Sequence, residues 1–207
     1  MPNRNPRQAD LYTAIKAEIC SGQLLPGHRV DMAGLGNRYS ASPSPVRNVL
    51  NRLVGEGLLE VHPNDGFYRP VVTEQVVREQ YSWNRSIMLL ALDSADTAPV
   101  QKPLPPLTIT TEDAVAAIEQ VFTAVAGLSD SRKTVDEMVA SNDQLRALRR
   151  QKPATLFDRS GEVSAFTAAW SSGDITALRQ EVLAYHDRRL AHISQIVAYA
   201  YQPTSGH

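Results

Sequence analysis

The sequence predicts a mainly α-helical protein, in which an N-terminal winged helix-turn-helix with three helices and a small two-stranded wing precedes an all-α helical bundle. Three observations lead to this prediction. Helical apolar periods recur in both halves of the chain, a strong helix-start signal stands near residue 42, and an Asp-Gly turn separates two short apolar runs. We expect two domains, residues 1–72 and residues 73–207.

The composition, with 43% hydrophobic and 21% charged residues over 207 positions, is that of an ordinary globular protein. No apolar run approaches the roughly 18 residues that cross a bilayer, so no membrane association is expected. The polar N-terminus shows no secretory signal, and we expect a cytoplasmic protein. The single cysteine, Cys20, excludes an internal disulfide and is expected to be a small core residue.

The two parts of the chain differ slightly in charge. Residues 1–70 hold eight Lys/Arg against six Asp/Glu, a net charge of +2, whereas the whole chain has −1. The asymmetry has the sign expected of a nucleic-acid-binding domain but is weak. A dimer, which doubles the phosphate contacts, is therefore the expected form if this domain binds DNA.

The N-terminal part begins with two short predicted helices. The first has one apolar stripe and a glycine stop at Gly22. Asp31 is the expected N-cap of the second helix, which runs to about Tyr39. The apolar stripe of the first helix consists of Leu11, Ile15 and Ile19.

A third predicted helix starts at Ser42, because a hydroxyl at the N-cap is followed by Pro43, whose missing N–H is not needed there. Its core positions recur at i, i+3, i+4 and i+7, and are Val46, Val49, Leu50 and Leu53. The remaining positions face outward and are Ser44, Arg47, Asn48, Asn51 and Arg52. This face has no acidic residue and fits a helix in the DNA major groove. The alternative is an ordinary solvated helix face.

A hairpin follows this helix. The segments Leu58–Val61 and Phe67–Arg69 flank a turn that ends in Asp65-Gly66, and Asp-Gly between apolar runs indicates a tight turn. Helix, turn, helix and two-stranded wing is an order typical of a DNA-binding domain.

Several phrases in this part resemble the DNA-binding domain of GntR-type bacterial transcription regulators over Leu11–Thr73. They are Ile19–Gly27, Ser42–Arg47, Leu53–Val61 and the wing glycine Gly66. The resemblance implies that Ser42, Ser44, Arg47 and the wing around Gly66 contact DNA.

The chain departs from the family pattern in two places. Family members usually have an arginine directly after the position of Ser42 and basic residues before the wing glycine, whereas this chain has Pro43 and Asn64-Asp65. We expect weaker binding or an unusual operator, because arginine is well shaped for guanine and Asp65 would repel a phosphate. Phosphate contacts from other residues would compensate for this weaker binding. The alternative is that the same residues are ordinary surface charges. They are His62, Arg69, Arg4 and Arg7.

The C-terminal part contains only helical patterns. Helices are expected to start at Thr73 and Asp174, the latter continuing to about Val197. The phrases Ser171–Asp174 and Tyr185–Arg189 resemble the helical FCD-like ligand-binding domain of the FadR branch of the same superfamily. That resemblance implies a domain that dimerises.

Many such domains hold a divalent metal, but the positions of the ligands are here Ile118, Phe122, Val163 and Tyr185, so we expect no metal and no cofactor. A pocket for a small-molecule effector, such as a carboxylate, remains possible on this resemblance. Its candidate residues are Arg85, Asn142, Arg146, Arg149, Tyr185 and Arg189. The competing interpretation makes these surface or helix-capping charges.

No nucleophile elbow, phosphate loop, dinucleotide fingerprint or paired-histidine metal motif is found in the sequence, so an enzyme is not expected. We expect a regulator that binds an inverted repeat of double-stranded DNA as a homodimer, with affinity modulated by an effector. The alternative is an effector-binding or protein-interaction module whose winged helix binds DNA without sequence preference, as Pro43 and Asp65 suggest.

Overall fold

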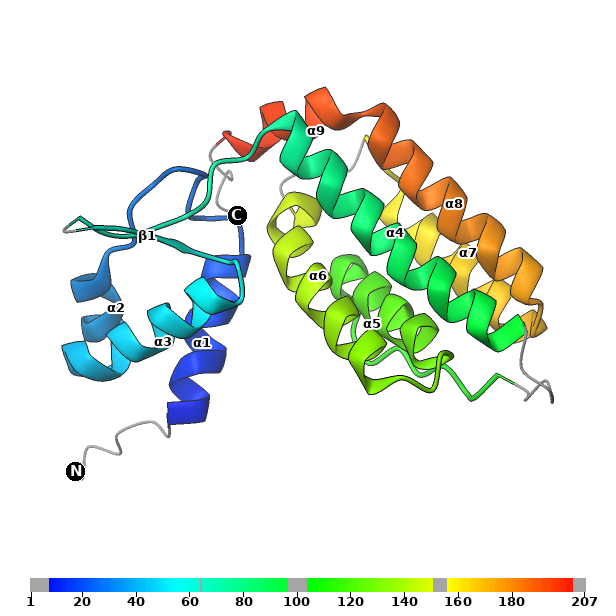
Figure 1. Cartoon of the computed structure of the whole chain (residues 1–207), viewed down its shortest axis with the longest axis horizontal. Coiled ribbons are helices and arrows are strands. Elements are labelled where there is room, and N and C mark those ends of the chain that lie inside the picture. Colours follow the sequence, from blue (N-terminus) through cyan, green and yellow to red (C-terminus); the bar gives the residue numbers. More distant parts are fainter. Residues whose placement is uncertain (1–7, 64, 97–103, 151–155, 203–207) are drawn as a thin grey trace. The chain divides into compact units, whose positions relative to one another are not determined.

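The structure is a computed structural model and describes residues 8–63, 65–96, 104–150 and 156–202. These residues form nine α-helices and one two-stranded antiparallel sheet, which confirms the predicted fold class (Figure 1). The elements up to the wing are α1 (Gln8–Cys20), α2 (Met32–Arg38), α3 (Pro43–Gly55), β1 (Glu60–His62) and β2 (Gly66–Tyr68). The later helices are α4 (Glu74–Asp96), α5 (Ala114–Gly127), α6 (Arg132–Arg150), α7 (Arg159–Ser172), α8 (Ile175–Ala191) and α9 (Ile193–Ala200).

The chain divides into two compact units. Among the described residues, the first consists of 8–63, 65–72, 146–150 and 198–202, and the second of 73–96, 104–145 and 156–197. The chain first passes from one unit to the other after Val72, and the described residues 146–150 and 198–202 group with the first unit. The domain bounds expected from the sequence, residues 1–72 and 73–207, stay a prediction.

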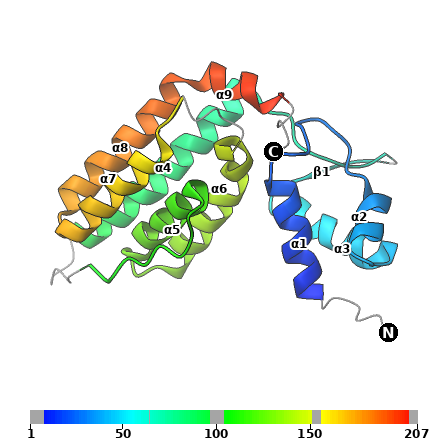
Figure 2. The same ribbon diagram turned by 180° about the vertical axis from the view of Figure 1, so that it is seen from behind.

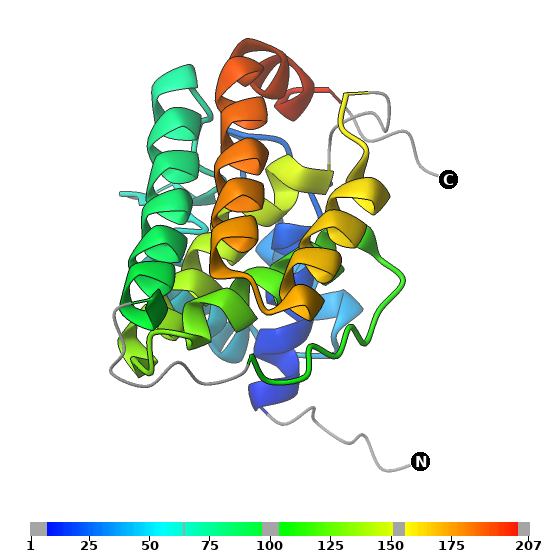
Figure 3. The same ribbon diagram turned by 90° about the vertical axis from the view of Figure 1, so that its right-hand side faces the viewer.

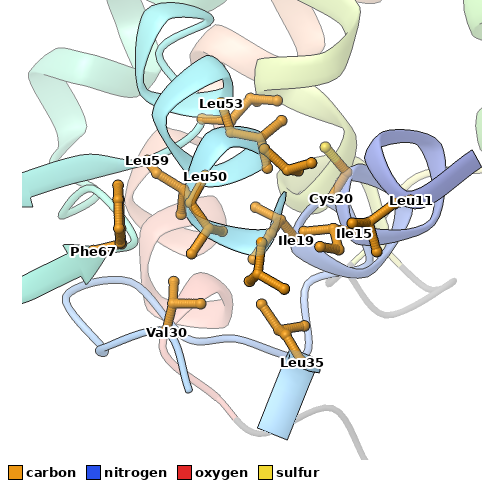
Figure 4. Packing of buried hydrophobic residues seen from close by; sticks show 13 residues of the cluster. Leu11, Ile15, Ile19, Cys20, Val30, Leu35, Leu50, Leu53, Leu59 and Phe67 are labelled. Carbon is orange, nitrogen blue, oxygen red and sulfur yellow. The ribbon is translucent and has the colours of Figure 1, made fainter. Parts of the chain in front are cut away.

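The core of the first unit lies where α1, α3 and the loop before α2 meet (Figure 4). The predicted stripe of α1 is buried there, as are the predicted core positions of α3. Cys20 is 2% exposed and is a member of this core, as expected. Burial of these side chains fixes which face of α3 remains outside, since a helix cannot bury two opposite faces in one small core.

The wing is a short hairpin that is held to the rest of the unit by its second strand. Strand β1 pairs with β2 in antiparallel register, with Val61 opposite Phe67. On its other side β2 meets the segment before α2, where Val30 N donates to the Phe67 carbonyl at 2.8 Å. Phe67 itself is buried in the core. The wing therefore has a fixed base and an exposed tip.

In the second unit, helices α4 and α8 lie side by side along much of their length (Figures 1 and 3). Helix α5 packs against both α4 and α7, and α7 packs against α8, which Figure 2 shows from behind. The N-cap predicted at Thr73 is confirmed, because its hydroxyl accepts a hydrogen bond from Val76 N at 3.2 Å. No helix in the described part of the chain is both long enough and apolar enough to span a membrane.

One predicted element is wrong in its extent. The helix that Asp174 caps ends at Ala191, and α9 begins at Ile193. The residue between them, His192, leaves the helical conformation with φ −118° and ψ 25°. Neither glycine nor proline marks this break, so nothing in the local sequence signals it.

Candidate nucleic-acid interface

Helix α3 begins with an unusually open N-terminus. Ser42 is at the N-cap with extended backbone angles and Pro43 follows at the first helical position, as predicted. The Ser42 side chain, however, makes no capping hydrogen bond. Its hydroxyl and the backbone N–H of Ser44 are therefore available to an outside acceptor, such as a phosphate oxygen, whereas Pro43 and Pro45 have no N–H to offer.

The outward face of α3 consists of the residues that the apolar period predicted to be exposed. The side chains of Ser44, Arg47, Asn48 and Asn51 are exposed, whereas Val46, Val49, Leu50 and Leu53 are buried. Within the described residues, these four exposed side chains make no hydrogen bond or ion pair. The face thus presents one guanidinium and two amides to solvent without a competing carboxylate.

Arg52 does not share this freedom. Its guanidinium lies 3.6 Å from the centroid of the Tyr12 ring on α1, and its Nε donates to Glu56 at 3.0 Å. Glu56 also accepts hydrogen bonds from Tyr12 and Lys16. The expected DNA contact of Arg52 stays a prediction, and it would compete with these contacts to α1 and Glu56.

The wing tip is built around Tyr68. Its ring stacks on His62 with centroids 4.4 Å apart, and its hydroxyl donates to Asp65 at 2.5 Å. This hydrogen bond to a carboxylate raises the pKa of the Tyr68 phenol above its ordinary value. His62 and Asp65 remain exposed, but His62 Nε2 lies 3.1 Å from Glu60 Oε1, so the predicted phosphate contact would compete with this carboxylate.

Arg29 counters the charge of Asp65. Its Nη1 lies 3.9 Å from Asp65 Oδ1, and a Cβ added at Gly66 would lie 3.2 Å from its Nε. Gly66 has φ +118°, which strongly favours glycine. The repulsion expected from Asp65 is therefore reduced by a guanidinium that sequence reasoning missed. The only signal for Arg29 was its position beside Val30, which the wing strand contacts.

The structure places Arg69, which was predicted to contact phosphate, inside the first unit. Its side chain is 9% exposed, and Nη1 donates to the Ile19 carbonyl oxygen at 2.6 Å. Burial lowers the pKa of Arg69 below its ordinary value. The residue joins the end of the wing to the end of α1, so it stabilises the unit from inside.

The effector residues predicted in the bundle are mostly engaged in internal contacts. Arg85 pairs with Asp187 at 3.0 Å. Arg189 is 3% exposed, forms a two-point ion pair with Glu162 and stacks on Tyr185. The remaining candidates are the buried Asn142 and Arg149 and the partly buried Arg146. These contacts favour a role for Arg85 and Arg189 in holding the bundle together over a role in binding an effector.

The positions that the FadR-type resemblance assigns to metal ligands do not fit a metal. Phe122 and Tyr185 pack edge to face with centroids 4.9 Å apart, and Phe166 contacts both. Within the described residues, no cluster of three or more His, Cys, Asp or Glu side chains could hold an ion. Aromatic packing fills the place where ligands would stand.

A buried polar contact in the bundle was not predicted. The ring of His186 is fully buried, with Nδ1 2.7 Å from the Val182 carbonyl oxygen and Nε2 3.0 Å from Asn84 Oδ1. Asn84 stands at a core position of α4 and also donates to Ser141 on α6 at 2.9 Å. The signal was present in the sequence, since a polar residue at a core position of an amphipathic helix needs a partner.

Comparison with known proteins decides the nature of the first unit. Residues 7–68 match the family described as "Bacterial regulatory proteins, gntR family". The N-terminal domain is thus similar to the helix-turn-helix domain of this family. The GntR match agrees with the expectation that the chain is not an enzyme, because the matched family consists of regulatory proteins.

One curated relative is similar to the chain over part of its length. It is an "Uncharacterized HTH-type transcriptional regulator YdhC" from Bacillus subtilis, 28% identical over 88 residues. The match covers 42% of this chain and 39% of that protein, so the chain spans about two fifths of the relative in this alignment.

Solved structures extend the likeness in fold to most of the chain. E. coli McbR/YncC has a TM-score of 0.65 at 18% identity, covering 91% of this chain and 97% of that one. A structural-genomics GntR protein from Rhodococcus sp. RHA1 has a TM-score of 0.73 at 18% identity, covering 91% and 98%. The helical bundle that follows the GntR domain is thus an arrangement these proteins share.

Proposed function

We propose that the protein is a bacterial transcription regulator that binds an inverted-repeat operator in double-stranded DNA as a homodimer. The observation that supports this most strongly is the free outward face of α3. Arg47, Asn48 and Asn51 are exposed there without internal partners, inside a domain that matches the gntR family. Hydrogen-bond donors on one face of such a helix are what reading of base edges requires.

A face of α4 supports the dimer. Trp83 is 52% exposed and Leu90 is 58% exposed, and the two stand seven residues apart, which puts them on one side of the helix two turns apart. Two antiparallel copies of α4 related by a two-fold axis would place Trp83 against Leu90 of the partner subunit, twice. A parallel arrangement would instead bring Glu79 close to its own copy, so the antiparallel one is favoured.

The effector part of the proposal rests on the resemblance of the bundle to the FadR branch. A carboxylate that used Arg189 would have to replace Glu162, which already occupies both terminal nitrogens of this guanidinium. We therefore propose an effector that binds in the bundle without using Arg189. It can shift DNA affinity only if it binds the competent and incompetent dimers differently.

The proposal is tested by selecting duplexes from a random library with the purified protein. The affinity of the best sequence is then compared with that of a scrambled duplex over a salt series. We expect a preference of about 1000-fold or more. Weak, sequence-blind and steeply salt-dependent binding would instead favour a module with degenerate DNA binding.

Substitution of Arg47 tests the role of the outward face of α3 in DNA binding. Arg47→Ala should cost about 1–3 kcal/mol on the selected duplex, because a good bidentate contact to a base contributes this much. Arg132→Ala removes the same charge from an exposed position of the bundle and serves as the control. Equal effects of the two substitutions would contradict the role of Arg47.

A further inference from the structure

The outward face of α3 differs in composition from a face that is rich in arginine. Of the arginines on this helix, Arg52 is held by Tyr12 and Glu56, which leaves Arg47 exposed without a partner in the described residues. Its neighbours on the face are the amides of Asn48 and Asn51. Readout by this helix therefore depends on one guanidinium and two amides.

Helix geometry places these three side chains in one cluster. Successive residues turn by about 100° and rise about 1.5 Å, so Asn51 points between the directions of Arg47 and Asn48, about one turn further along. The cluster extends about 6 Å along the axis, which corresponds to about two base-pair steps. The three side chains can thus reach neighbouring base pairs of one half-site.

The two asparagines lower the stability of the helix, and a face that only contacts solvent would not need them. Asparagine is a weaker helix former than alanine, lysine or glutamate, because its amide competes for nearby backbone groups. Neither Asn48 nor Asn51 repays this cost with an internal hydrogen bond within the described chain. Their amides are left with donor and acceptor atoms free for a partner outside the protein.

We propose that α3 reads a half-site in which one guanine is adjacent to adenines, with Arg47 on the guanine and Asn48 and Asn51 on the adenines. An asparagine amide donates to adenine N7 and accepts from its N6 amino group, a pairing that guanine, with O6 in place of the amino group, cannot offer. A guanidinium matches the N7 and O6 acceptors of guanine. This inference rests on the proposed function.

The experiment is selection from a random duplex library with the wild-type protein and with the variants Asn48→Ala and Asn51→Ala. The wild type should enrich adenine at two positions beside a guanine in each half-site. Each variant should relax selection at one of these positions, by about 5- to 150-fold in relative affinity. Asn37→Ala, at an exposed position of α2, is the matched control and should leave the selected sequence unchanged.

A gain-of-function variant makes the test independent of simple loss of binding. Asn51→Arg should change the enriched base at its position from adenine to guanine, while thermal unfolding of the variant confirms that it is folded. The inference would be overturned if the wild type enriched a sequence without these adenines. It would also be overturned if the adenines persisted in both alanine variants. Either result would leave the proposed function as a regulator unaffected. Failure of the wild type to enrich any sequence would overturn the proposed function itself.

Discussion

Arg69 is held inside the first unit by the hydrogen bond from its Nη1 to the Ile19 carbonyl oxygen. Replacing it with methionine should lower the free energy of unfolding by about 2 kcal/mol, because a buried carbonyl loses a charged donor. Urea denaturation of the full chain, followed by circular dichroism, measures this. The control is Arg47→Met, an exposed position, which should change stability by less than about 0.5 kcal/mol. Equal losses in the two variants would contradict the structural role of Arg69.

Glu56 gives the first unit a dependence on pH. Burial would raise its pKa, but hydrogen bonds from Lys16 and Tyr12, with a further one from Arg52, hold the pKa below its ordinary value. A carboxyl with a lowered pKa stabilises the fold at neutral pH, and this contribution is lost as the pH falls through the folded-state pKa. Glu56→Gln should therefore cost about 1 kcal/mol at pH 7 and progressively less below about pH 4. A cost that stays constant from pH 7 to pH 3 would contradict this account.

The arginines show which residue roles the sequence can predict. The exposure of Arg47 follows from a local helical period, because its neighbours at three and four residues occupy the core. The burial of Arg69 depends on Ile19, 50 residues away, and the position of Arg52 depends on Tyr12 on another helix. Local patterns contain no information about such partners, so the internal contacts of these two residues could not be predicted from the sequence.

At the scale of elements, the ion pair of Glu162 with Arg189 joins α7 to α8. Both side chains are buried, and Arg188 donates to the same carboxylate at 2.9 Å. Glu162→Gln should lower the free energy of unfolding by about 3–5 kcal/mol, because it leaves a buried guanidinium without its counter-charge. Glu112→Gln, an exposed position before α5, is the control and should be nearly neutral. A small effect of Glu162→Gln in thermal unfolding would show that the pair is not important for packing.

The exposed face of α4 predicts the effect of a charge at its centre. Leu90→Arg should convert the proposed dimer to a monomer, because the proposed two-fold arrangement would bury this side chain against an apolar one, and an isolated charge is costly to bury. Light scattering after size-exclusion chromatography measures the mass. The variant Ser164→Arg adds the same charge at an exposed position of α7 and should remain dimeric. Equal masses for the wild type and Leu90→Arg would exclude this face as the interface.

Two local features of the elements lay beyond what the sequence could indicate. The break at His192 has no glycine or proline, and the turn before α3 places Ser40 at φ +50°, a conformation that costs a non-glycine residue about 1 kcal/mol or more. By contrast, the expected caps at Asp31 and Asp174 each accept backbone N–H groups. Helix starts with a side-chain signal were predictable because the signal and its effect are close in sequence.

At the scale of the molecule, the order of the elements was predictable because each has its own period or turn residue. The side-chain packing inside the bundle was not predictable, because the aromatic contacts among Phe122, Phe166 and Tyr185 join three different helices. This packing replaces the ligands that a metal would need. Under the proposed function, regulation would therefore depend on how a dimer presents two α3 helices.

The most direct test of a dimer that reads an inverted repeat is the affinity for two duplexes of equal length. One duplex contains both half-sites of the selected repeat. The other keeps one half-site and has the second half-site scrambled. Fluorescence anisotropy at a fixed salt concentration should show binding weaker by about 100-fold or more for the second duplex, because one of two linked contacts is lost. Equal affinity for both duplexes would contradict the account.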